Sequence, residues 1–96
     1  MAITNFDYNL AIQQANRIDA VAGEMKSVAD NEMQSSLDSL NACWRGEASR
    51  QFINCCVATQ ADIKAQAGNL QNIAGRIREA ANILKDIEDR ARAVVN

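Results

Sequence analysis

Asn41-Ala42-Cys43-Trp44-Arg45-Gly46-Glu47 lies near the middle of the 96-residue chain and is the one segment where a helix is expected to break. Gly46 supplies the backbone freedom that a tight turn needs. Glu47 follows it, and a carboxylate in the first turn of a helix interacts favourably with the helix dipole. A short connection places consecutive helices side by side and antiparallel, so this segment predicts a helical hairpin. The alternative is one unbroken helix through Gly46, because a single interior glycine costs only about 1 kcal/mol.

Before the turn, apolar residues recur along one helix face from Tyr8 to Trp44. Ten steps cover 36 residues, a mean of 3.6 residues a step, which is the repeat of a straight α-helix. Thr4 is expected to cap the start of this helix, with Asp7 in its first turn. We predict helix one over about residues 5–42. Between its two ends, the face contains Ala11, Ala15, Ile18, Ala22, Met25, Ala29, Met33, Leu37 and Leu40.

After the turn, apolar residues follow alternating steps of three and four, a heptad pattern with a mean period of about 3.5 residues. This pattern predicts helix two over about residues 47–94, and the change of period at the turn favours a hairpin over one rod. Ala67, Ala74 and Ala81 are expected to widen the stripe along one flank, which suits a helix with more than one neighbour. The stripe contains Phe52, Cys56, Ile63, Leu70, Ile73, Ile77, Ala80, Leu84, Ile87, Ala91 and Val94.

The predicted fold class is all-α, an antiparallel two-helix hairpin that forms one domain over residues 1–96 with its turn at 43–46. Two helices bury one line of contact, whereas Val21 and Val28 widen the apolar set of helix one. Because monomers rarely leave a long apolar patch in water, we expect a four-helix bundle on dimerisation. A homodimer is the commonest arrangement, and a heterodimer with a related hairpin is the alternative. The expected core of the hairpin and of the dimer is Ile18, Met25, Met33, Leu37, Leu40, Phe52, Ile63, Leu70, Ile73, Ile77, Leu84 and Ile87.

Composition argues against several classes of function. The net charge is −2 with no basic patch, so nucleic-acid binding is not expected. The apolar runs are too short for a stable membrane span, and residues 1–6 lack the pattern of a cleaved signal peptide. With no histidine, no phosphate-binding loop and no nucleophile beside a base, we expect neither an enzyme nor a cofactor or metal site. Cys43, Cys55 and Cys56 are interpreted as small packing residues, and a cysteine link between subunits stays an open alternative.

The Trp44-Arg45-Gly46 triplet, centred between two long amphipathic helices in a chain of 96 residues, resembles the WXG100 (ESAT-6-like) family of type VII secretion substrates. The resemblance implies a hairpin that dimerises, with itself or with a related WXG100 protein. It also implies export by a type VII secretion ATPase in the membrane, without a cleaved signal peptide. In such a dimer the W-x-G turn of one subunit would lie near the C-terminal tail of the other, forming a surface that the ATPase reads. The alternative role for Trp44 is a hydrophobic plug over the helix ends.

The C-terminal tail departs from the family pattern. Members often carry a Y-x-x-x-D/E signal after helix two, whereas the single tyrosine of this chain is Tyr8. The tail offers only a Leu84-x-x-x-Glu88 frame, so either the signal is degenerate or a partner protein supplies it. Charged residues here are spaced for ion pairs on the outer face, as at Asp86 and Arg90.

The functional prediction is a non-enzymatic, dimeric protein of a type VII secretion system, secreted or held at the cell surface. It would act as an effector or as a secretion partner. The alternative from a different class is an intracellular coiled-coil adaptor with a chance W-x-G turn. Membrane disruption has little support, because neither helix combines a basic polar face with aromatic anchors.

Overall fold

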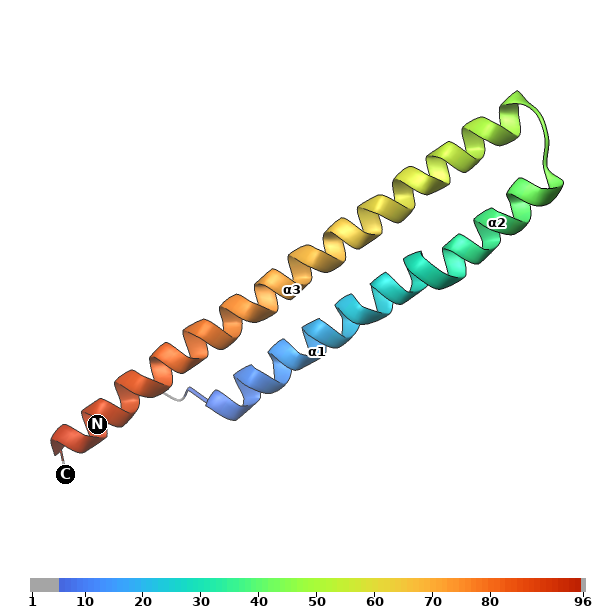
Figure 1. Ribbon diagram of the computed structural model, residues 1–96. Coiled ribbons are helices and arrows are strands. Elements are labelled where there is room, and N and C mark those ends of the chain that lie inside the picture. The colour runs from blue at the N-terminus through green and yellow to red at the C-terminus, as the bar shows by residue number, and fades with distance from the viewer. Residues whose placement is uncertain (1–5, 96) are drawn as a thin grey trace.

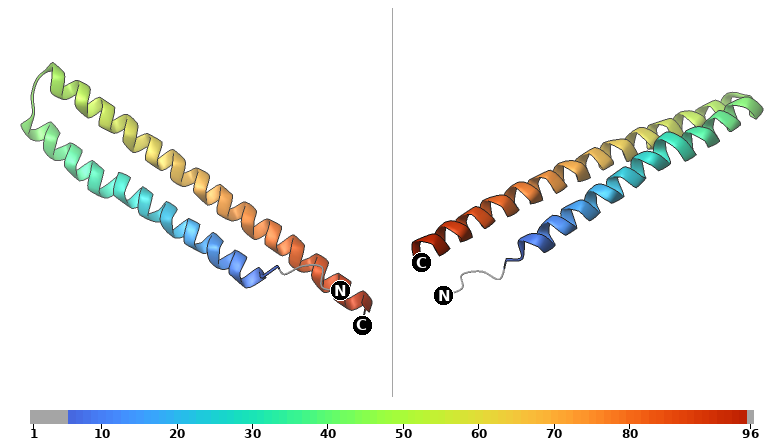
Figure 2. Two further views of the ribbon diagram at one scale, coloured as in Figure 1. Left: turned by 180° about the vertical axis from the view of Figure 1, so that it is seen from behind. Right: turned by 60° about the horizontal axis from the view of Figure 1, so that its bottom comes forward.

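In the computed structural model, residues 6–95 are described and form two antiparallel helical arms joined by a short turn (Figure 1). The first arm consists of α1 (Tyr8–Ser27), the π-helical segment η1 (Val28–Met33) and α2 (Gln34–Cys43). The second arm is the single helix α3 (Glu47–Val95). The molecule measures 75 × 16 × 14 Å, and both views in Figure 2 show the arms side by side along the length of the first arm. The predicted all-α hairpin is confirmed.

Asp7 caps the first arm. Its side chain accepts a hydrogen bond from the backbone N–H of Leu10 at 3.0 Å, and its backbone carbonyl accepts one from Ala11 at 3.1 Å. A side-chain cap of this kind contributes about 1 kcal/mol to a helix. α1 therefore begins at Tyr8, later than the predicted start near residue 5, and the predicted cap, Thr4, lies outside the described residues. Aspartate is a stronger N-cap than threonine, which accounts for the later start.

The contact between the arms is centred on alanines that recur at every seventh position of each arm. Small side chains at the line of closest approach let the two backbones come near each other, and larger residues then pack on either side. The expectation that the alanines of α3 form one flank of the stripe is therefore wrong, because they occupy its centre. The buried alanines are Ala15, Ala22, Ala29, Ala67, Ala74 and Ala81, each 2% exposed or less. We call this line the seam.

One side of the seam is polar. The residue four positions after a seam residue lies on one side of it, and the residue three positions after lies on the other. On the four-after side, α3 presents polar residues that reach across to the first arm, and we call this side the polar flank. Each partly exposed pair contributes only about 0–1 kcal/mol, but together they cover this side of the contact. The cross-arm contacts of this flank include Lys64–Asp30 at 2.8 Å, Lys26–Gln71 at 2.9 Å, Arg78 with Asp19 and Asn16, and the Lys85 ammonium over the Tyr8 ring.

The π-helical segment η1 lies where the heptad spacing of the first arm is broken. Ala15, Ala22 and Ala29 are seven apart, whereas the next seam residue, Leu37, follows after eight and is 4% exposed. A π-turn holds one residue more than an α-turn, so η1 absorbs the extra residue and Leu37 still faces α3. The interpretation of the 3.6-residue mean as one straight helix face is therefore wrong. It is a heptad pattern with one insertion, and the supposed change of period at the turn disappears.

Candidate functional site

The chain enters its reversal at Trp44. α2 ends at Cys43, and the backbone at Trp44 is extended, with φ −113° and ψ 127°. The N–H of Trp44 still donates to the carbonyl of Leu40 at 2.8 Å, so the last turn of α2 is closed before the chain leaves the helix. Trp44, Arg45 and Gly46 therefore form the whole connection between the two arms.

Gly46 completes the reversal with a backbone torsion that favours glycine. Its φ is 114°, in the left-handed region that residues with a Cβ rarely adopt. A Cβ at this position would meet nothing within 4 Å, so the torsion and not a lack of space requires glycine. The carbonyl of Gly46 then accepts hydrogen bonds from the Ser49 hydroxyl at 2.8 Å and the Arg50 backbone N–H at 3.1 Å. These two contacts join the turn to the first turn of α3.

Trp44 packs against Phe52 of α3 at the tip of the hairpin. Their rings meet edge to face, with centroids 5.5 Å apart and planes at 71°. Trp44 is nevertheless 46% exposed and Phe52 49% exposed. The indole thus packs against the α3 side chain Phe52 and at the same time leaves a large aromatic surface in water, which is a common feature of recognition sites.

The cysteines gather towards this end of the molecule. Cys43 ends α2, and Cys55 and Cys56 lie in the N-terminal part of α3. All three are free thiols in this hairpin; Cys43 and Cys55 are exposed, and Cys56 is half-buried. Within one hairpin, the interpretation as packing residues therefore applies only to Cys56.

The side of the seam opposite the polar flank is apolar. Residues four positions after a seam residue pair the two arms on the polar flank. Residues three positions after a seam residue, from both arms, therefore lie together on the other side of the seam. The residue directly before each seam residue lies next to this apolar series, and many of these preceding residues remain exposed. We call this side the apolar flank. It contains Ile18, Val21, Met25, Val28, Phe52, Ile63, Leu70, Ile73, Ile77, Leu84 and Ile87.

Burial within one hairpin divides the residues expected to form the core. Leu37 alone among them is fully buried, at 4% exposed. Ile18, Met25, Met33, Leu40, Ile63, Leu70 and Ile77 are half-buried, and Phe52, Ile73, Leu84 and Ile87 are 40–55% exposed. Large aliphatic side chains therefore line the contact between the arms on one side and continue onto the surface.

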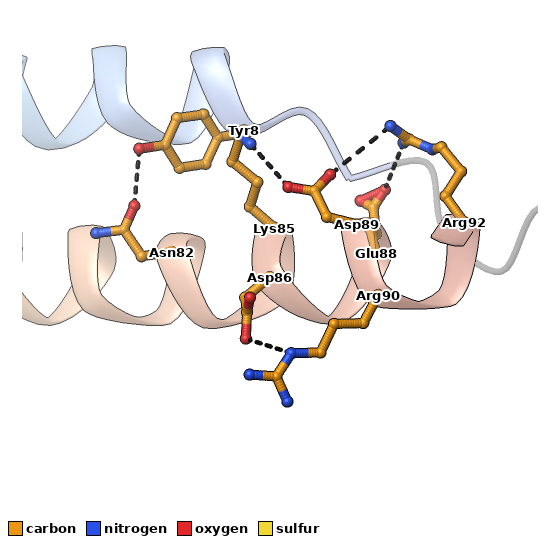
Figure 3. Close-up of polar contacts among 8 residues, drawn as sticks. All are labelled: Tyr8, Asn82, Lys85, Asp86, Glu88, Asp89, Arg90 and Arg92. Carbon is orange, nitrogen blue, oxygen red and sulfur yellow. Dashed lines mark hydrogen bonds and ion pairs between the residues drawn. The ribbon is translucent and has the colours of Figure 1, made fainter. Parts of the chain in front are cut away.

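The C-terminal part of α3 extends past the start of α1 (Figure 3). The Tyr8 phenol donates to Asn82 Oδ1 at 2.7 Å, which marks the last side-chain hydrogen bond between the arms in the described chain. Beyond this point the described ion pairs lie within α3, and the predicted pairing of Asp86 with Arg90 is present at 3.2 Å. The hydrogen bond to Asp89 and its charge raise the pKa of Lys85 above its usual value.

The two residues of the tail frame differ in surroundings. Leu84 belongs to the apolar flank and is 40% exposed. Glu88 lies seven residues after the buried Ala81, on the seam line, and its side chain pairs with Arg92 at 4.0 Å. The frame therefore presents an aliphatic side chain and a carboxylate one helical turn apart, on the part of α3 next to where the first arm begins.

Two absences apply to the part of the chain that the structure covers. Among residues 6–95, no cluster of three or more histidine, cysteine or acidic side chains could hold a metal ion. Over the same residues, no helix combines the length and apolarity needed to cross a membrane.

Fold and site together define a class of protein: a small helical hairpin whose two long arms are joined by a W-x-G turn. The family model WXG100, described as proteins of 100 residues with WXG, matches residues 4–89. The chain belongs to the WXG100 family. Neither a curated protein nor a solved structure matches it significantly. Membership implies a small helical substrate of type VII secretion, from a family that is typically dimeric and not known for enzymes.

Proposed function

We propose that this protein is exported by a type VII secretion system as a four-helix-bundle homodimer and acts as a secreted effector or as a secretion partner. The observation that carries the proposal is the contrast between the two sides of the hairpin. Polar contacts cover one side of the seam, and the other side leaves large aliphatic residues in water. A hairpin of this kind is half of a bundle.

The apolar flank favours a second helical hairpin as its partner. Val21, Ile73 and Ile87 are 49%, 46% and 55% exposed and come from both arms. Burying the exposed half of one such side chain contributes roughly 1 kcal/mol, so a flank of this length offers enough apolar surface for a stable interface. Two-fold symmetry lets the same flank meet itself, which needs no second gene product. A heterodimer with a related WXG100 protein is the competing outcome.

Dimerisation also gives the tip and the tail a shared role. If the two hairpins run antiparallel, the Trp44 turn of one subunit lies near the extended end of α3 of the other. The half-exposed indole, Leu84 and Glu88 would then contribute to one surface for the secretion ATPase. In this proposal the Leu84-x-x-x-Glu88 frame is a degenerate export signal, and a partner that supplies the signal is the alternative.

The proposal assigns the protein a binding role with no catalytic step, cofactor or metal. Its location would be the medium or the cell surface.

Export in paired strains tests the proposal. The protein is expressed with an active and with an inactivated type VII ATPase, and a cytoplasmic enzyme is followed as the control for lysis. We expect recovery outside the cytoplasm only in the active strain. Recovery in the cytoplasm alone, while another substrate of the same system is exported, would favour the intracellular adaptor.

A further inference from the structure

The extra residue of the first arm can be located from two independent series of spacings. Along the seam, Ala29 and Leu37 are eight residues apart. Met25 and Met33, which belong to the neighbouring series of apolar residues on the same arm, are also eight residues apart. Elsewhere in the first arm, the residues of both series are spaced seven residues apart. The insertion therefore falls between Ala29 and Met33, inside the segment that the structure assigns to η1.

Gln60 of α3 faces this segment. It occupies the seam position seven residues before Ala67, the first of three successive alanines on the seam of α3, and it is only 9% exposed. Its Nε2 donates to the backbone carbonyl of Ala29 at 2.5 Å and to Gln34 Oε1 at 3.0 Å. The amide nitrogen of Gln34 donates in turn to Asp38 at 2.9 Å, which holds the Gln34 oxygen towards Gln60. Gln60 thus contacts the start of η1 at Ala29 and the first residue after it, Gln34.

The position of the π-turn decides which residues of α2 face α3. If the insertion were absorbed nearer the tip, the intervening residues would be rotated by about 100° around the helix axis. Leu37 would then leave the seam for the polar flank. Repeating alanines cannot prevent such a shift, whereas a buried polar residue with one correct partner can, as single polar residues fix register in coiled coils.

We propose that Gln60 is a positioning residue: by pinning the one-residue insertion at η1, it fixes the rotation of α2 and so holds Trp44 against Phe52 at the tip. Gln60 lies in α3, 16 residues after Trp44 in the chain, and does not touch the turn. The placement of the indole is measured on purified protein, so the result is independent of export.

The experiment uses the full chain with Gln60→Met, which keeps the side-chain length and removes both donors. Gln66→Met, at an exposed position of the same helix, is the matched control. Because Trp44 is the only tryptophan and Phe52 one of two phenylalanines, their NMR cross-peaks are simple to assign. We expect Gln60→Met to weaken the Trp44–Phe52 cross-peaks and to lower amide protection in residues 29–40, with a Tm loss of about 5 °C or more. The control should leave all three unchanged.

A second background separates positioning from general stability. Deleting Glu32, which is exposed, returns both series to spacings of seven and removes the need for a π-turn. In that background, Gln60→Met should leave the Trp44–Phe52 contact and the amide protection intact. If Gln60→Met leaves the contact unchanged in the natural chain, or disturbs it equally in both backgrounds, the inference is overturned. Should Gln60→Met unfold the natural chain, recovery of the fold on deletion of Glu32 supports the inference, and continued unfolding contradicts it.

Discussion

The Arg78 guanidinium pairs with the Asp19 carboxylate across the hairpin, four residues after a buried alanine on each arm. Ile77, three residues after the buried Ala74, lies by the same geometry on the other side of the seam. The seven-residue repeat of the seam thus places polar residues on one side of the contact between the arms and apolar residues on the other side, where many stay exposed.

The apolar flank is tested by Ile73→Ser. We expect the dimer dissociation constant to rise roughly 30-fold, because the substituted side chain occurs twice in a symmetric interface and each copy loses about 1 kcal/mol of apolar burial. Sedimentation equilibrium measures the change. Val57→Ser is the matched control, since Val57 is similarly exposed, at 48%, but lies on the four-after side. Equal weakening by both substitutions would mean that the interface does not follow the apolar flank.

The backbone at the turn predicts opposite effects at two glycines. Gly46→Ala should lower the free energy of unfolding by about 1–2 kcal/mol, because alanine is strained at φ 114°. Gly23→Ala, inside α1 with nothing within 4 Å of the new Cβ, should raise it by about 0.5–1 kcal/mol. Urea denaturation followed by circular dichroism gives both values. A neutral Gly46→Ala would show that the turn does not depend on the left-handed torsion.

The exposed indole predicts that Trp44→Ala impairs export more than folding. Its ring is 46% exposed, so the helices should remain formed while the surface offered to the secretion machinery is lost. The secreted fraction and the far-ultraviolet dichroism are measured on the same variant. Trp44→Phe, which retains an aromatic ring against Phe52, distinguishes loss of the indole from loss of packing. Normal export of Trp44→Ala with intact helicity would contradict this role.

The tail frame is tested by Glu88→Gln with Asp86→Asn as its control. Both residues form i,i+4 ion pairs within α3, but only Glu88 belongs to the proposed signal. We expect Glu88→Gln to reduce the secreted fraction several-fold and Asp86→Asn to leave it unchanged, with dimerisation retained in both. Export that is insensitive to Glu88→Gln would favour a partner as the source of the signal.

Much of the fold could be predicted from the sequence. The central Gly46 indicates the reversal, and the apolar face of the first arm matches the side that packs on α3 as far as Leu40. The apolar residues of α3 were harder to assign, because large side chains dominate a hydrophobicity pattern. In the structure the smallest residues, such as Ala67 and Ala74, take the closest approach, and the large ones take the sides.

The mean apolar spacing of the first arm does not predict the π-turn or its contact with Gln60. A mean of 3.6 residues per step suits a straight helix, and the average hides a single step of eight between Ala29 and Leu37. The individual spacings, compared with the seven-residue spacings of Ala67, Ala74 and Ala81, indicate the insertion. Gln60 itself was visible only as a polar residue in line with Ala67. Its partner, the carbonyl of Ala29, is a backbone atom that carries no signal in the sequence.

Light scattering on the purified chain at micromolar concentration tests the central claim most directly. The chain has a mass of 10.5 kDa, and we predict a particle of twice that mass, because the apolar flank would otherwise stay in water. A particle of 10.5 kDa would contradict the account, since a hairpin that is stable alone has no need of a bundle.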